Sequence, residues 1–252
     1  MTQLKYKEAL KESFSFYFNN FKDIFFIYLI LFIPSIPLYY TKNELFGNLE
    51  HLLVYLFLSI IFFIIFYTLT RLTIYFYYEE EKSILKSIKK SIKNYFPFLL
   101  TYLITVVAVF ISVIISLFIS IFISIPFFII NMQLSKIIYI ISFIAFSLLL
   151  IILFNKIFFS PMIVVFKKKT IYDSLYESWR NIKIKDSALI LFFNFLIDSI
   201  LIITYIIQIY YNNSVYFSLL NSFISSEFVT PIGNLFSIIL YKQYSKKIKL
   251  FF

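Results

Sequence analysis

The chain has 252 residues, of which 61% are hydrophobic and only 14% are charged, and its formal net charge is +10. A soluble globular domain has about 45–50% apolar and about 25% charged residues, so this composition excludes an ordinary soluble enzyme. The chain has no cysteine, one histidine and two glycines. These counts exclude disulfides, thiolate catalysis, a two-histidine metal site within one chain and glycine-rich phosphate loops. We therefore expect no metal and no cofactor.

Long uncharged segments predict six membrane-spanning helices, because about 20 apolar helical residues cross the hydrocarbon core of a bilayer. The predicted spans are residues 24–41, 52–74, 96–124, 137–159, 187–209 and 216–241. Residues 94–135 are all uncharged, and as one helix they would be about 63 Å long, about twice the thickness of the core. Pro126, Asn131 and Gln133 predict a break there, so we expect an interfacial loop after the third span. The expected fold is an all-α, polytopic membrane bundle that forms one domain over residues 1–252.

Lysine and arginine fall on one side of this predicted bundle. All but Lys42 and Lys136 of the 23 Lys and Arg residues lie in the N-terminal segment, the loops after the second and fourth spans, and the C-terminal tail. Such cations mark the cytoplasmic side, so we expect a multi-pass plasma-membrane protein with both termini in the cytoplasm. We expect this basic face to contact anionic lipid headgroups. Nucleic acid is not expected as a partner, because the lysines are spread over four short segments beside the spans.

Three cytoplasmic segments, one before each odd-numbered span, resemble one another. ALKES at 9–13 aligns with SILKS at 83–87 and with SLYES at 174–178. Apolar residues recur at helical spacing in each: Leu10, Phe14, Tyr17 and Phe21; Ile84, Ile88 and Ile92; Ile171, Leu175, Trp179 and Ile182. This pattern predicts three amphipathic helices in the headgroup plane, with their lysines toward water. One such helix with two spans predicts a three-fold internal repeat about an axis along the membrane normal.

One stretch of the chain also carries a family resemblance. It consists of FSPMIVV at 159–165, KKK at 167–169 and YDSLYESW at 172–179. In this stretch and in its six-span layout, the chain resembles membrane proteins related to the membrane domain of glycerophosphoryl diester phosphodiesterases. The resemblance implies the architecture but no catalytic residues. No soluble catalytic domain follows Phe252, so we expect no phosphodiesterase activity.

Asp198 in the fifth span and Glu227 in the sixth are carboxylates that the sequence places inside the membrane. Helical spacing puts Asn194 and Tyr205 on the side of Asp198, and Thr230 and Asn234 on the side of Glu227. A charged carboxylate is costly at mid-bilayer and normally faces the interior of a bundle, so we expect both polar stripes to face inward. Two interpretations stay open: interhelical hydrogen bonds that join the two spans, or a site that handles protons or cations.

A second pattern lies in the third span, where a small residue recurs at every fourth position. The pattern consists of Ala108, Ser112, Ser116, Ser120 and Ser124. Small residues at this spacing let a neighbouring helix approach closely. We interpret the pattern as a helix-packing seam, and a hydrophilic pathway lined by the serines is the alternative.

The motifs of known intramembrane enzymes are missing from the sequence. It contains neither a G-x-S-x-G elbow nor an H-E-x-x-H zinc pattern. The leading hypothesis is therefore a non-catalytic integral membrane protein that acts as a membrane scaffold or a lipid-engaging module. One alternative is a proton- or cation-coupled transporter or channel for small molecules that uses Asp198 and Glu227. Another is the membrane subunit of an enzyme whose catalytic chain is encoded separately.

Overall fold

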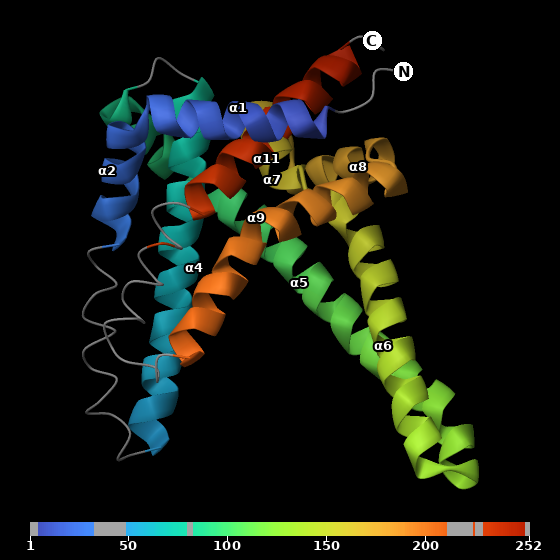
Figure 1. Cartoon of the computed structure of the whole chain (residues 1–252). Coiled ribbons are helices and arrows are strands. Elements are labelled where there is room, and N and C mark those ends of the chain that lie inside the picture. The colour runs from blue at the N-terminus through green and yellow to red at the C-terminus, as the bar shows by residue number, and fades with distance from the viewer. Residues whose placement is uncertain (1–4, 33–48, 80–82, 211–223, 225–228, 250–252) are drawn as a thin grey trace. The chain divides into compact units, whose positions relative to one another are not determined.

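The computed structural model describes residues 5–32, 49–79, 83–210, 224 and 229–249, and every element in these ranges is helical (Figure 1). The side chains of residues 30–32, 49–63, 201, 202, 204, 205, 207–210 and 247–249 lie outside this description. The all-α fold class predicted from the sequence is confirmed. The chain forms two compact units: unit 1 is Met1–Phe96 with Phe193–Phe252, and unit 2 is Pro97–Phe192. The single domain expected from the sequence stays a prediction.

Unit 1 combines helices from both ends of the chain. They are α1 (Tyr6–Asn19), α2 (Phe21–Phe32), α4 (Leu49–Glu79), the first turns of α5 (Ile84–Ile130), the later turns of α9 (Ile184–Tyr210) and α11 (Thr230–Lys249). Helix α11 packs on α1 and α4, and α2 packs on α4 (Figure 1). The break between α1 and α2 falls at Asn20, whose backbone N–H donates to the carbonyls of Phe16 and Tyr17.

The core of unit 1 lies where α4 and α11 are buried on every face. Residues 72–77 of α4 are all buried, and so are residues 234–241 of α11. A helix that is apolar on all sides belongs inside a protein or a membrane. Pro231 lies in the first turn of α11, where its missing N–H costs no helical hydrogen bond. The last described helix of the chain is therefore a central element of unit 1.

Unit 2 is a long helical hairpin with short helices at one end (Figure 1). It contains the rest of α5, then α6 (Met132–Phe154), the 3₁₀ turn η4 (Asn155–Ile157), α7 (Ser160–Phe166), α8 (Ile171–Asn181) and the first turns of α9. Helix α8 packs on α7 and on η4. We call residues 155–187 the base of unit 2. Residues 159–165 of the base are all buried, whereas α6 buries a single side chain, that of Ser135.

The turn of the hairpin lies at Asn131, one of the three residues that predicted the break, whereas Pro126, another of them, lies inside a helix. Helix α5 runs through both Pro97 and Pro126 to Ile130, and only Asn131 separates it from α6. A proline inside a helix removes one hydrogen bond, which a long helix can tolerate, whereas the side chain of an asparagine at the turn can cap the helix that follows. At Asn131 the backbone is extended, and the side-chain oxygen accepts from the N–H groups of Gln133 and Leu134. The expected interfacial loop is thus a one-residue turn.

The other predicted boundaries also shift. Helices α4 and α9 are longer than the spans predicted at 52–74 and 187–209. Residues 83–96, expected as a separate interfacial helix, continue into the hairpin as part of α5. Helix α11 begins at Thr230 and continues to Lys249, past the predicted end of the sixth span. Residues 33–41 of the first predicted span, and 216–223 and 225–228 of the sixth, lie outside the described residues.

Within the described ranges, two helices are long and apolar enough to cross a membrane. They are Ile84–Ile130 and Met132–Phe166, the second of which takes α6, η4 and α7 together. In the 18-residue apolar window that qualifies each helix, only 17% of the residues of the first and none of the second are buried. The apolar core helix of a soluble protein would be mostly buried. The two helices of the hairpin are mostly exposed, so they do not have the burial of such core helices. The count of six spans and the three-fold repeat stay predictions.

The cap at Asn131 yields a prediction. We expect Asn131→Ala to lower the free energy of unfolding by about 1 kcal/mol, because it removes the acceptor for two N–H groups of α6. Asn131→Ser keeps an acceptor oxygen and should cost less. Denaturant titration of the purified protein in detergent micelles measures both. Equal stability of the native chain and Asn131→Ala would contradict the role of the cap.

Candidate functional site

The carboxylate expected in the fifth span lies on an exposed face of its helix. Asp198 is exposed on α9, and Asn194, one turn earlier, is half-buried. Between them Ile197 is buried, and its Cγ2 atom lies 3.9 Å from where a β-carbon on Gly233 would stand. Helix α9 therefore meets α11 through an apolar contact beside the predicted polar stripe.

Of the remaining predicted residues of this site, Thr230 and Asn234 have side chains that the structure describes. Glu227 and the side chain of Tyr205 lie outside the described residues. Thr230 is half-buried at the start of α11. Asn234 is buried and donates from Nδ2 to the Tyr28 hydroxyl of α2 over 2.8 Å. The partner of Asn234 is thus a tyrosine from the other end of the chain, a contact that no local pattern in the sequence indicates.

The serine pattern of the third predicted span forms a buried stripe along α5. Ser112, Ser116 and Ser120 are fully buried, Ser124 is nearly so, and Ala108 is half-buried. The four hydroxyls donate to carbonyls of the preceding turn of α5, as serine commonly does in helices. The hairpin is also closed by the Ser135 hydroxyl, which donates to the Ser124 carbonyl over 3.0 Å. The packing seam and the hydrophilic pathway both stay predictions.

The three segments with similar sequence share a buried stripe that differs from the predicted apolar one. Its members are Ala9, Ser13 and Tyr17 in α1, Ser87 and Ser91 in α5, and Ser174, Ser178 and Ile182 at α8. In α1 this stripe lies against α11, and in α8 it lies against η4, where Ser178 Oγ donates to the Lys156 carbonyl over 2.7 Å. Small side chains let these helices approach their neighbours closely. Most of the predicted apolar stripe is consequently half-buried or exposed.

A polar network joins four helices of unit 1 near the lysines of α1. The Tyr77 hydroxyl of α4 donates to Asp23 of α2 over 2.5 Å, and the Tyr78 hydroxyl donates to Glu12 of α1. Lys242 of α11 pairs with Glu79 over 3.2 Å, and its ammonium group lies 4.1 Å from the Tyr78 ring centroid. These contacts tie α1, α2 and α11 to the C-terminal end of α4.

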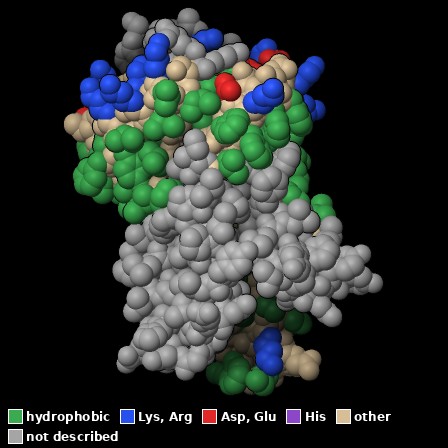
Figure 2. All heavy atoms as spheres, turned by 90° about the vertical axis from the view of Figure 1, so that its left-hand side faces the viewer, with side chains coloured by type: hydrophobic (Ala, Val, Ile, Leu, Met, Phe, Trp, Pro, Cys, Tyr) green, Lys and Arg blue, Asp and Glu red, His purple; other side chains and the backbone are tan. Residues whose placement is uncertain are grey.

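Lysines, by contrast, point outward from α1 and α2. Lys7, Lys11 and Lys22 are exposed. Figure 2 shows Lys and Arg side chains gathered along one edge of the displayed face, next to a band of hydrophobic side chains. The surface of these helices therefore has a positive edge beside an apolar one, which is the pattern of a protein at a membrane–water interface.

The base of unit 2 contains a carboxylate between two lysines. Glu177 of α8 accepts from Lys167 at 2.5 Å through Oε1 and pairs with Lys169 at 2.7 Å through Oε2. The Glu177 side chain is only 10% exposed. Lys168, between the two lysines, has a φ angle of 51°, in the left-handed region that non-glycine residues rarely adopt. The chain reverses there between α7 and α8.

The two lysines determine the ionisation of Glu177. Burial by itself would raise the pKa of the Glu177 carboxyl, but the hydrogen bonds and charges of Lys167 and Lys169 outweigh it and lower the pKa below its ordinary value of 4.5. Sequence reasoning missed this cluster. Its signal was a glutamate on the small-residue face of α8, eight residues after the last of three consecutive lysines, and that face becomes buried only through tertiary packing.

No metal site and no similar protein indicates a chemical role for the residues described above. Within the described ranges no group of three or more His, Asp or Glu side chains is placed to hold a metal ion. Comparison of the chain with family models, with curated proteins and with solved structures finds no match. The features of the chain that bear on its function are therefore the exposed apolar hairpin and the distribution of charge.

The ion cluster yields a pH prediction. Because the folded state lowers the pKa of Glu177, the unfolded chain binds more protons between the two pKa values, and stability rises with pH across that window. The contribution of Glu177 is complete above about pH 4.5 and is lost as the pH falls through its folded pKa. At neutral pH, Glu177→Gln should lower the free energy of unfolding by about 2–3 kcal/mol, because two lysines lose their counter-charge.

The measurement is denaturant unfolding of the native chain and of Glu177→Gln in detergent across the acidic range. The difference between the two proteins should shrink toward low pH. A difference that stays constant with pH would contradict the assignment of the ion pairs.

Lys168 yields a second prediction at the same turn. We expect Lys168→Val to lower the free energy of unfolding by about 1–2 kcal/mol relative to Lys168→Asn, because a β-branched residue is strained at positive φ. Asparagine tolerates this conformation, and both substitutions remove the same charge. Thermal unfolding of the two variants in one detergent measures the difference. If the two variants are equally stable, the left-handed conformation at this position is wrong.

Proposed function

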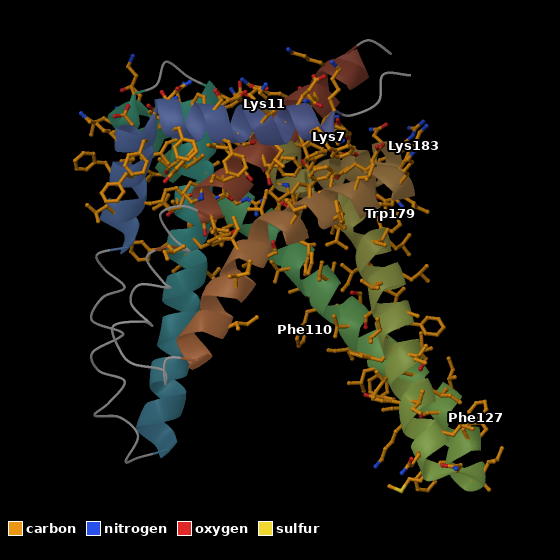
Figure 3. All side chains as sticks on the ribbon, viewed as in Figure 1. Lys7, Lys11, Phe110, Phe127, Trp179 and Lys183 are labelled. Atoms are coloured by element: carbon orange, nitrogen blue, oxygen red, sulfur yellow. The ribbon has the colours of Figure 1, made fainter. Side chains whose placement is uncertain are left out.

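We propose that the chain is a non-catalytic integral membrane protein whose basic surfaces engage the anionic headgroups of the bilayer. The observation that carries this proposal is the exposed apolar surface of the α5–α6 hairpin. Along α5, Phe110, Phe118, Phe122 and Phe128 are all exposed, and Figure 3 shows Phe110 projecting from this helix. A surface of this extent in contact with water would be strongly unfavourable.

The length of the hairpin supports the same proposal. Helix α6 has 23 residues, which corresponds to about 34 Å at 1.5 Å per residue and matches a hydrocarbon core of about 30 Å. A helical backbone satisfies its own hydrogen bonds and so tolerates an apolar solvent. We assign α5 and α6 to the third and fourth of six spans, and we retain the three-fold repeat and the family resemblance as parts of the proposal.

The distribution of charge in unit 2 supports an orientation. The base, residues 155–187, contains seven Lys and Arg and three Asp and Glu residues. Lys136, near the turn at Asn131, is the one cation between residues 97 and 155. Figure 3 shows Phe127 near the turn and Trp179 and Lys183 at the base, toward opposite ends of α6. By the bias of lysine toward the cytoplasm, the base lies on the cytoplasmic side of the plasma membrane.

The absence of cysteine from the chain makes a direct test available. Single cysteines are introduced as Lys136→Cys and Lys168→Cys, and intact host cells are treated with a membrane-impermeant maleimide. We expect labelling of Lys136→Cys in intact cells and of Lys168→Cys only after permeabilisation. We also expect both proteins to stay with the membrane after alkaline carbonate washing.

The two variants control for each other, because both replace an exposed lysine of unit 2. Recovery of the protein in the soluble fraction would refute membrane insertion. Labelling of Lys168→Cys from outside, with Lys136→Cys protected, would refute the orientation.

A further inference from the structure

We propose that the exposed face of α8, formed by Tyr172, Tyr176 and Trp179, binds an anionic phospholipid whose phosphate is contacted by Lys156. The inference rests on the proposed function, since it names the class of lipid that the base of unit 2 engages. Three observations carry it: an aromatic stripe that faces away from the protein, a tryptophan at the end of the apolar hairpin, and a lysine held against that tryptophan.

The aromatic stripe occupies the side of α8 opposite to its buried serines. Tyr172 is 75% exposed, Tyr176 is 54% exposed and Trp179 is 36% exposed. Their spacing of four and then three residues places them on one helical face, and the first two rings stack with centroids 6.5 Å apart. The opposite face, with Ser174 and Ser178, is fully buried. The stripe is therefore held outward by the packing of the other side.

Trp179 lies where the apolar hairpin ends. Its ring centroid is 6.3 Å from that of Phe154, the last residue of α6. The Lys156 ammonium, from the 3₁₀ turn that follows α6, lies 4.6 Å from the Trp179 ring centroid. Tryptophan and tyrosine rings concentrate at the headgroup level of membranes because they are apolar at one end and polar at the other. These neighbours place Trp179 between the hydrocarbon and the headgroups.

Lys156 is available to a ligand phosphate. Its attraction to the indole ring restricts the ammonium group, and all three of its N–H bonds can still donate. The buried carboxylate Glu177 pairs with Lys167 and Lys169. The excess of cations in the base favours an anionic headgroup over a zwitterionic one. The aromatic stripe favours a lipid over a soluble anion, because it offers the acyl chains an apolar surface beside the cation.

Trp179 is the one tryptophan of the chain, so its fluorescence reports on this site alone. The full-length protein is reconstituted into bilayers that contain a small, fixed fraction of brominated phosphatidylglycerol or of brominated phosphatidylcholine, with bromine near the headgroup end of the chains. Excitation at the red edge of the indole absorption band excites Trp179 without exciting the tyrosines of the chain. We expect quenching that corresponds to about a five-fold local enrichment of phosphatidylglycerol, since one lysine near the surface contributes about that factor.

Two substitutions of Lys156 and one matched control complete the experiment. Lys156→Gln should abolish the preference for phosphatidylglycerol, and Lys156→Arg should keep it, because the guanidinium retains the charge and the contact with the ring. Lys136→Gln removes an exposed lysine near the turn of the hairpin and should leave the preference intact. The matched control thus separates a local headgroup site from a general effect of net charge.

Each other outcome would overturn a specific claim. Equal quenching by the two brominated lipids, in the native protein, would refute the anionic site while leaving membrane insertion in place. Quenching by aqueous iodide but by neither lipid would also refute the proposed insertion of unit 2. Loss of the phosphatidylglycerol preference on addition of inorganic phosphate, at constant ionic strength, would identify a soluble-anion site in place of a lipid site.

Discussion

The exposed apolar surface of the α5–α6 hairpin is the constraint on which the structure of unit 2 depends. Helix α6 buries only Ser135 and still keeps its helical conformation from Met132 to Phe154. In hydrocarbon, a backbone N–H or carbonyl without a partner costs several kcal/mol. A continuous helix removes that cost, and it does so even through Pro126, where only one hydrogen bond is lost. The same constraint moves the turn to Asn131, whose side chain can cap the next helix.

Small side chains determine how the helices pack. The buried stripes of α1, the start of α5, and α8 contain alanine and serine at every fourth position, while the larger apolar residues stay at the borders. Small side chains let the backbones of neighbouring helices approach closely, which strengthens the van der Waals contact between them. Serine serves this purpose because its hydroxyl can donate to its own helix, as it does in α5, and so leaves no unsatisfied polar atom at the contact.

Charge and aromatic rings are concentrated where the apolar surface ends. At the base of unit 2 the buried Glu177 neutralises two of the three consecutive lysines and fixes the reversal between α7 and α8. This reversal places α8 across the end of α6, so that Trp179 lies beside both Phe154 and Lys156. In unit 1, the carboxylates of Glu12 and Asp23 accept hydrogen bonds from tyrosine hydroxyls of α4, and the lysines of α1 and α2 remain exposed. Both units therefore present a positive surface next to an apolar one.

The sequence by itself determined the all-helical fold and the location of the long apolar segments. It also determined that most lysines of unit 2 lie in the base and only Lys136 lies near the hairpin turn. These properties follow from composition and from local periodicity, because a helix satisfies its own backbone wherever it lies. The tertiary structure alone decided which face of each amphipathic segment is buried. The sequence pattern predicted that the face with Leu10 in α1 and with Leu175 in α8 is the buried one. In the structure the neighbouring residues Ala9 and Ser174 are buried instead, because a smaller side chain lets the packed helices come closer together. It also decided that Asn234 pairs with Tyr28 and Glu177 with Lys167 and Lys169, because such partners come from separate helices and no local pattern encodes them.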